Sequence, residues 1–115
     1  IITRGIDNCL FCYSIDTFNK ISNKLNELPF TKKDARDFNR FFMSGATNVE
    51  LDKQGRINIS PVLINYAHLI KDCVIIGTGD RIEIWSSDNW ESFFNSTKDI
   101  MSDIAENLFN ESVNL

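Results

Sequence analysis

The sequence predicts an α+β protein built from two copies of one structural unit. Each copy consists of a strand, a turn, a second strand and then a helix. Apolar, strand-like runs lie at residues 1–3, 9–13, 73–76 and 81–85. A shift of 72 positions superposes the two copies, which identifies an internal repeat, and it pairs Gly5 with Gly77, Leu10 with Ile82, Tyr13 with Trp85, Ser14 with Ser86, Asp16 with Asp88 and Phe18 with Trp90.

The composition is that of a folded, well-packed protein. Of the 115 residues, 43% are hydrophobic, which is enough to form a core. No apolar run approaches the roughly 20 residues that a membrane-spanning helix needs, and the first residues do not have a signal-peptide layout. We therefore expect a cytoplasmic protein and exclude the membrane, collagen-like and disulfide-framework classes.

Two helices are expected between the strand pairs. Asp16 is a suitable N-cap for the first helix, whose apolar residues recur at helical spacing until Pro29 ends it. Thr31 and Asp34 resemble a capping box at the start of the second helix, and Gly45 closes it. One face of this second helix is expected to be buried, because it carries Ala35, Phe38, Phe41 and Phe42.

Further elements are expected in the second copy. Residues 48–51 and 57–59 read as two strands of a β-hairpin around the turn at 52–56. Ser60 and Pro61 open a short helix, and residues 77–80 are expected to form the turn between the later strands. A long amphipathic helix is predicted from about Asp88, with a buried side formed by Trp90, Phe93, Thr97, Met101, Ile104 and Leu108.

The hairpin and short helix of the second copy have no counterpart in the first. The same shift would place the partner of Glu50 about 22 positions before Ile1. We therefore expect the first repeat to be incomplete, without its opening half.

The three cysteines do not predict a metal site. Cys9 and Cys12 form a C-x-x-C, with Cys73 and His68 as conceivable further ligands. However, apolar residues occupy the positions where a zinc knuckle has its turn, and residues 9 and 12 of a strand face opposite sides. We expect reduced, structural thiols, with no metal and no cofactor.

The charge is unevenly distributed along the chain. The net charge is −4, yet residues 31–56 hold six cations against four anions. From Ser87 onward there are six anions against Lys98 alone, so the acidity is concentrated in the tail. The middle of the chain is therefore the part that suits contact with DNA phosphates.

Several motifs resemble those of the MraZ family, in the same order and at the same spacing. They lie at residues 2–5 (ITRG), 28–36 (LPFTKKDAR), 42–46 (FMSGA), 51–56 (LDKQGR) and 82–85 (IEIW). The resemblance implies tandem AbrB-like swapped-hairpin repeats, double-psi-like small β-barrel elements with flanking helices. It also implies a nucleoid-associated transcriptional regulator that binds promoter direct repeats in double-stranded DNA, upstream of the division and cell-wall gene cluster, and that forms ring-shaped homo-oligomers. Cys12 departs from the family, which usually has Gly there.

On this basis the chain divides into four parts. They are the second half of the first AbrB-like repeat (1–28), an inter-repeat helix (29–46), the second AbrB-like repeat (47–94) and an acidic C-terminal helix or tail (95–115).

The 52–56 turn is the predicted DNA-binding site. On an exposed hairpin, Arg56 can pair with guanine and Lys53 can contact phosphate, and Gln54 beside them is also expected to contact DNA. Asp52 and Gly55 are predicted to structure the loop, because Asp accepts turn hydrogen bonds and Gly permits a positive φ. The roles of Asp52, Gly55 and Arg56 are partly what the MraZ resemblance implies.

A second basic surface is predicted on the helix after Thr31. Lys32, Arg36 and Arg40 recur every four residues, with Lys33 beside them. These residues either provide auxiliary phosphate contacts or form a solvated or subunit-contacting face.

Two other functions remain open on the sequence alone. One is a protein-interaction or antitoxin-like module, in which the hairpins mediate oligomerisation and the acidic tail contacts a partner. The other is a small hydrolase that uses Glu50, Asp52 and Glu83, although no nucleophile or metal cluster accompanies these carboxylates. We predict that the protein is not an enzyme and has no catalytic residues.

Overall fold

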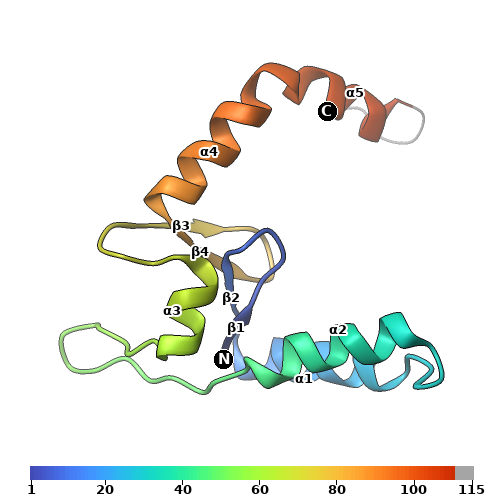
Figure 1. Cartoon of the computed structure of the whole chain (residues 1–115), viewed down its shortest axis with the longest axis vertical. Coiled ribbons are helices and arrows are strands. Elements are labelled where there is room, and N and C mark those ends of the chain that lie inside the picture. The colour runs from blue at the N-terminus through green and yellow to red at the C-terminus, as the bar shows by residue number, and fades with distance from the viewer. Residues whose placement is uncertain (111–115) are drawn as a thin grey trace.

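A computed structural model of the chain describes residues 1–110 and confirms the α+β class (Figure 1). Four strands form one antiparallel sheet in the order β1-β2-β4-β3. The strands are β1 (Ile2–Arg4), β2 (Leu10–Cys12), β3 (Cys73–Gly77) and β4 (Ile82–Ser86). The helical elements are α1 (Ile15–Asn26), α2 (Lys33–Ser44), α3 (Pro61–Ala67), α4 (Ser87–Thr97), the 3-10 helix η1 (Lys98–Ile100) and α5 (Met101–Phe109).

The two repeats meet in the middle of the sheet. β2 pairs with β4 so that Phe11 lies opposite Glu83, and these two residues are also related by the shift of 72. An antiparallel pair with equivalent residues at its centre has a local twofold axis through that centre, perpendicular to the sheet. The structure therefore confirms the internal repeat and shows that its copies are related by an approximate twofold axis.

The number of residues that separates equivalent positions of the two repeats differs between the outer strands, β1 and β3, and the inner strands, β2 and β4. Ile2 pairs with Cys12 and Ile75 pairs with Ile84, so β1 and β3 correspond at a spacing of 73. The expected pairing of Gly5 with Gly77 is therefore wrong by one residue. The cause is a difference in turn length. The turn between β1 and β2 is closed by a bond from the Gly5 amide to the Cys9 carbonyl, and it is one residue longer than the turn between β3 and β4, which is closed by a bond from the Thr78 amide to the Arg81 carbonyl.

Each face of the sheet has its own apolar cluster. One cluster contains Phe11, Tyr13 and Trp85 and is covered by side chains of α1 and α2; we call this side the α1 face. The other contains Ile2, Leu10 and Ile84 and is covered by Leu63 and Ala67 of α3; we call it the α3 face. Cys9 belongs to the first cluster and Cys12 packs against the second, as the strand alternation predicts.

The end of α2 is fixed to β1 by polar contacts. The Thr3 hydroxyl donates to the Phe42 carbonyl at 2.5 Å, and the Arg4 Nη1 donates to the Phe41 carbonyl at 2.9 Å and to the Ser44 hydroxyl at 2.8 Å. Gly45 leaves room for the arginine, because a Cβ at this position would lie 2.9 Å from Arg4 Nη1. The chain thus leaves α2 at a defined point beside β1.

The helix starts differ from those expected. Ser14 and Ser86, rather than Asp16 and Asp88, cap α1 and α4, and each accepts a backbone N–H of the first turn. Asp16 and Asp88 instead lie within the first turn of each helix, where their negative charge interacts favourably with the positive end of the helix dipole. The expected capping box at Thr31 is also wrong, since α2 begins at Lys33 and its N-cap Lys32 makes no side-chain cap bond.

The C-terminal helix is neither continuous nor buried. A 3-10 turn at η1 separates α4 from α5, and neither helix contains a buried residue. Phe93, Met101 and Leu108 of the predicted buried side are exposed. The reason is visible in Figure 1, where α4 and α5 extend away from the sheet. The last part of the predicted acidic tail, 111–115, lies outside the described residues.

The predicted strands at 48–51 and 57–59 do not form. Residues 48–59 make an irregular segment, here called the arm, and the nearest β-bridge joins Ile2 to Thr47. A strand needs a neighbour for its amides and carbonyls, and within residues 1–110 the sheet ends at β1 and β3. The sheet is open, so the expected barrel-like closure is not seen in this part of the chain. No helix in the described residues is both long and apolar enough to cross a bilayer.

Packing of α3 on the sheet provides a test of this fold. Leu63 is 1% exposed, so Leu63→Ala should leave a cavity and lower the free energy of unfolding by about 2–5 kcal/mol. The neighbouring Val62 is exposed, and Val62→Ala should change it by less than about 0.5 kcal/mol. Urea unfolding followed by circular dichroism measures both values. Similar losses for the two variants would contradict the packing of α3.

Candidate nucleic-acid interface

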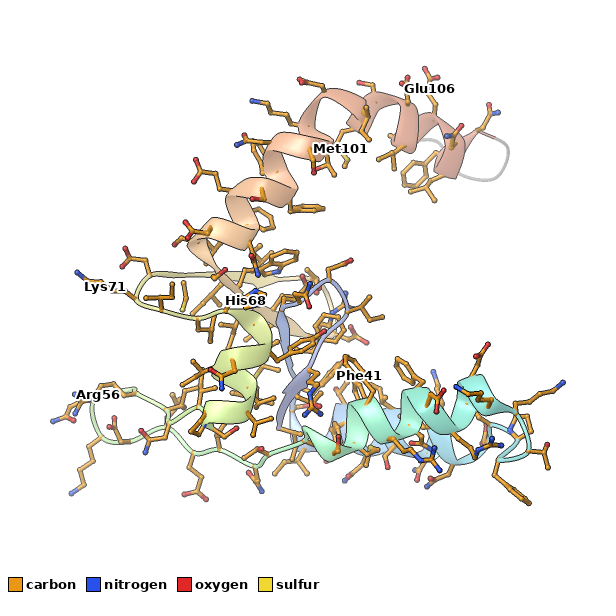
Figure 2. The ribbon with its side chains drawn as sticks, viewed as in Figure 1. Phe41, Arg56, His68, Lys71, Met101 and Glu106 are labelled. Atoms are coloured by element: carbon orange, nitrogen blue, oxygen red, sulfur yellow. The ribbon has the colours of Figure 1, made fainter. Side chains whose placement is uncertain are left out.

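The arm carries the 52–56 loop away from the rest of the protein. Figure 2 shows Arg56 at the outer end of this loop, on the opposite side of the sheet from the tip of the α1–α2 hairpin. The base of the arm is held by Val49, Ile57 and Ile59, which pack against the α3-face cluster. The loop therefore projects from a fixed base rather than from a free terminus.

Asp52 organises the loop through its carboxylate. The Oδ1 atom accepts backbone N–H bonds from Gln54 at 2.9 Å and from Arg56 at 2.8 Å. The Asp52 amide donates to the Arg56 carbonyl at 2.8 Å and so closes the loop. The bond from the Arg56 amide is the main reason why the pKa of Asp52 is lowered.

Gly55 gives the loop its turn. Its φ is +76°, and its N–H donates to the Asp52 carbonyl at 3.0 Å. Nothing lies within 4 Å of where a Cβ would be. The requirement for glycine is therefore conformational and does not come from crowding.

Arg56 is positioned by its neighbours and open to solvent. Its Nε donates to the Asp52 Oδ2 at 3.3 Å, its Nη2 contacts the Gln54 Oε1, and its side chain is 71% exposed. Asp52 thus holds the Nε side, while the outer edge of the guanidinium faces away from the carboxylate. Gln54, which was predicted to contact DNA, here contacts Arg56 instead. Lys53 is exposed beside them.

The basic residues of α2 are not brought together with this loop. Lys33 and Arg40 both pair with Asp37, at 2.5 and 3.5 Å, and the Arg36 Nη1 donates to the Phe30 carbonyl at 3.0 Å. Lys32 is the N-cap residue at the start of the helix. α2 and the 52–56 loop lie on different sides of the sheet in Figure 1. Within one chain, the two predicted basic surfaces are therefore separate.

The remaining sequence candidates have structural contacts. Glu83 accepts bonds from Arg81 at 2.8 Å and from the Trp85 indole at 3.0 Å, and Arg81 stacks over the Phe11 ring at 4.3 Å. Glu83 is thus engaged by its own neighbours Arg81 and Trp85. Burial raises the pKa of the Cys9 thiol to about 12, so this cysteine stays protonated. Among the described residues, no three His, Cys, Asp or Glu side chains are placed to hold a metal ion.

Sequence reasoning missed the Arg81–Glu83–Phe11 cluster. Phe11 and Glu83 lie on β2 and β4, at the centre of the twofold-related pair, and Arg81 immediately precedes β4. The alternation of Arg81, Glu83 and Trp85 in the sequence could have predicted the cluster, because residues two apart in an extended segment lie on the same face.

These features define a two-repeat α+β protein that presents an exposed, preorganised basic loop. The comparison with protein families agrees with this description. A family model described as "MraZ protein, putative antitoxin-like" matches residues 1–41 and again residues 42–111. The chain therefore belongs to the MraZ family.

Replacing Gly55 tests the turn. Gly55→Ala places a Cβ at positive φ, which costs about 1–2 kcal/mol, and should lower the hydrogen-exchange protection of the Arg56 amide by roughly tenfold. Gly77 has ordinary φ and equally open surroundings, so Gly77→Ala is the matched control and should leave that amide unchanged. Equal protection of the Arg56 amide in wild type and Gly55→Ala would argue against the turn.

The loop should also respond to pH in a defined direction. The pKa of Asp52 is lowered from 3.8, so its bonds stabilise the loop above the ordinary pKa of an aspartate. That stabilisation is lost as the pH falls through the lowered pKa. An NMR titration should show the Asp52 carboxyl and the Arg56 amide changing together, with a midpoint below 3.8. A midpoint at or above 3.8 would show that the bonds to Asp52 are not formed in solution.

Proposed function

We propose that this protein is a sequence-specific transcriptional regulator that binds promoter direct repeats of the division and cell-wall gene cluster. Membership in the MraZ family supports the regulatory part of the proposal. The 52–56 loop supports the DNA-binding part, because Arg56 is both exposed and oriented by Asp52. A guanidinium held in this way loses little freedom when it pairs with a base edge in the major groove. The protein would then be associated with the nucleoid.

The 52–56 loop is the main support for the proposal, because its two cations, Lys53 and Arg56, are exposed while the base of the arm packs against the α3-face cluster. Arg56 provides the base contact in this proposal, and Lys53 a phosphate contact. The Gln54 amide has to exchange its contact with Arg56 for one with DNA, or stay in place and support the arginine. Asp52 remains behind the guanidinium, where its charge is directed at Arg56 rather than at phosphate.

One loop provides only a few contacts, so the proposal includes assembly. Loops held in a homo-oligomer, such as the ring that we propose in keeping with tandem AbrB-like repeats, meet consecutive DNA repeats at high effective concentration. The basic stripe of α2 then serves as an auxiliary phosphate-binding surface in the assembled protein. Its internal pairing with Asp37 limits each of these contacts to a small contribution.

A second candidate function is a protein-interaction module. The family description includes the term antitoxin-like, and the C-terminal helices α4, η1 and α5 expose Phe93, Phe94, Ile100 and Met101. Contiguous exposed apolar side chains are typical of surfaces that bind another protein. In this alternative the 52–56 loop has no direct role in reading DNA.

Removing Arg56 should distinguish the two functions. In the proposed function, Arg56→Ala weakens binding to promoter-repeat DNA by about 1–3 kcal/mol per base contact and leaves binding to random DNA much less affected. Fluorescence anisotropy at two salt concentrations measures both. Arg40→Ala should weaken all sequences alike and reduce the salt slope by roughly one unit.

Circular dichroism melts confirm that the Arg56 and Arg40 variants are folded. If folded Arg56→Ala keeps the wild-type preference for the promoter repeats, the loop does not read DNA and the interaction module becomes the better description. A binding constant that hardly changes with salt would have the same meaning, because phosphate contacts release counterions.

A further inference from the structure

The side chain of Gln54 has a specific contact inside the 52–56 loop. Its Oε1 atom accepts a hydrogen bond from the Nη2 of Arg56. The chemistry of the two groups fixes which end of the amide faces the arginine. A guanidinium has only donors, and the oxygen is the only acceptor of a glutamine amide. The amide oxygen of Gln54 is therefore occupied within the loop.

One carboxylate holds the backbone of both partners. The Asp52 Oδ1 accepts the Gln54 N–H at 2.9 Å and the Arg56 N–H at 2.8 Å. The two residues are thus fixed relative to each other before their side chains meet. A contact between side chains on a fixed backbone loses less conformational entropy than one between side chains on a free chain.

Two acceptors cover one side of the Arg56 guanidinium. The Nε–H and one N–H of Nη2 point to the same side of this planar group. The Asp52 Oδ2 accepts from Nε at 3.3 Å, and the Gln54 Oε1 accepts from Nη2. Acceptors on two neighbouring nitrogens fix the plane of the guanidinium, which a single acceptor does not.

The other edge of the guanidinium is open. It is formed by Nη1 and by the second N–H of Nη2, and no acceptor contacts it in the part of the chain that the structure describes. The Arg56 side chain is 71% exposed. Asp52 and Gln54 therefore leave one defined pair of donors facing outward.

We propose that Gln54 is a positioning residue, which orients the outward edge of Arg56 for a base and does not itself read one. This inference rests on the proposed DNA-binding function of the loop. A glutamine reads adenine with its oxygen and its nitrogen together, and the oxygen of Gln54 is already bound to Arg56. Without Gln54, the plane of the guanidinium is fixed only when DNA binds, and ordering a side chain on binding weakens affinity.

NMR relaxation of the free protein tests the positioning without DNA. In Gln54→Ala, the order parameter of the Arg56 Nε–H group should fall by about 0.2, because one of its two holding contacts is lost. Gln54→Glu keeps an oxygen acceptor at this position and should restore the wild-type value. Lys53 is exposed in the same loop, so Lys53→Ala is the matched control and should leave the order parameter unchanged. All three variants keep Asp52 and Gly55, which form the turn.

A double-mutant cycle tests the consequence for DNA reading. Gln54→Ala should reduce the preference for promoter-repeat DNA over random DNA by about threefold to tenfold in the wild-type background. In the Arg56→Ala background the same change should have no effect, because there is no guanidinium left to orient. Lys53→Ala should weaken both DNAs alike. Fluorescence anisotropy at one salt concentration measures all of these variants.

The possible results separate this inference from the function on which it rests. If Gln54→Ala reduces the preference equally in both backgrounds, Gln54 contacts a base by itself and the positioning role is wrong, although the loop still reads DNA. An unchanged Arg56 order parameter in Gln54→Ala would also overturn the positioning role. If the wild-type protein shows no preference for promoter repeats, the proposed function fails and Gln54 has no role in base reading, whatever the NMR result.

Discussion

The pairing of β2 with β4 is the contact on which the rest of the structure depends. Three residues from each strand join the two repeats, with Phe11 opposite Glu83 at the centre. This centre is reinforced by side chains, because Arg81 binds Glu83 and stacks on the Phe11 ring. The contact between Arg81 and the Phe11 ring joins the two repeats, and a cation–π contact of this kind is stronger where it is partly shielded from water. Both apolar clusters include residues of both repeats, so neither would form without this pairing.

The 52–56 loop combines local rigidity with exposure. Its hydrogen bonds all lie between residues no more than four apart, so the loop shape is a property of its own sequence. Its position, however, is set by distant contacts, since the Ile2–Thr47 bridge fixes one end of the arm and the Ser60 cap of α3 fixes the other. Shape and placement therefore have independent physical origins.

The sequence predicted what local interactions determine. Helical spacing located α1 and α2, Ser60 and Pro61 located α3, and Asp52 with Gly55 predicted a turn at the loop. The predicted strands at 48–51 and 57–59 failed because a strand depends on a partner that periodicity does not reveal. The prediction of a buried helix side after Asp88 was wrong for a similar reason. An amphipathic pattern shows that one face of a helix is apolar, but it does not show that another element packs against that face. The Arg81–Glu83–Phe11 cluster depends on strand register between repeats.

The twofold-related repeats differ from independently folding domains. The family model divides the chain at residues 41 and 42, yet α3 from the second part covers β1 from the first, and α2 is tied to β1 by Thr3 and Arg4. Cutting the chain at that boundary would expose apolar surface on both pieces. During synthesis, residues 1–41 leave the ribosome before α3 and β4 exist, so Ile2 and Leu10 of the first repeat stay uncovered until those later elements have been made.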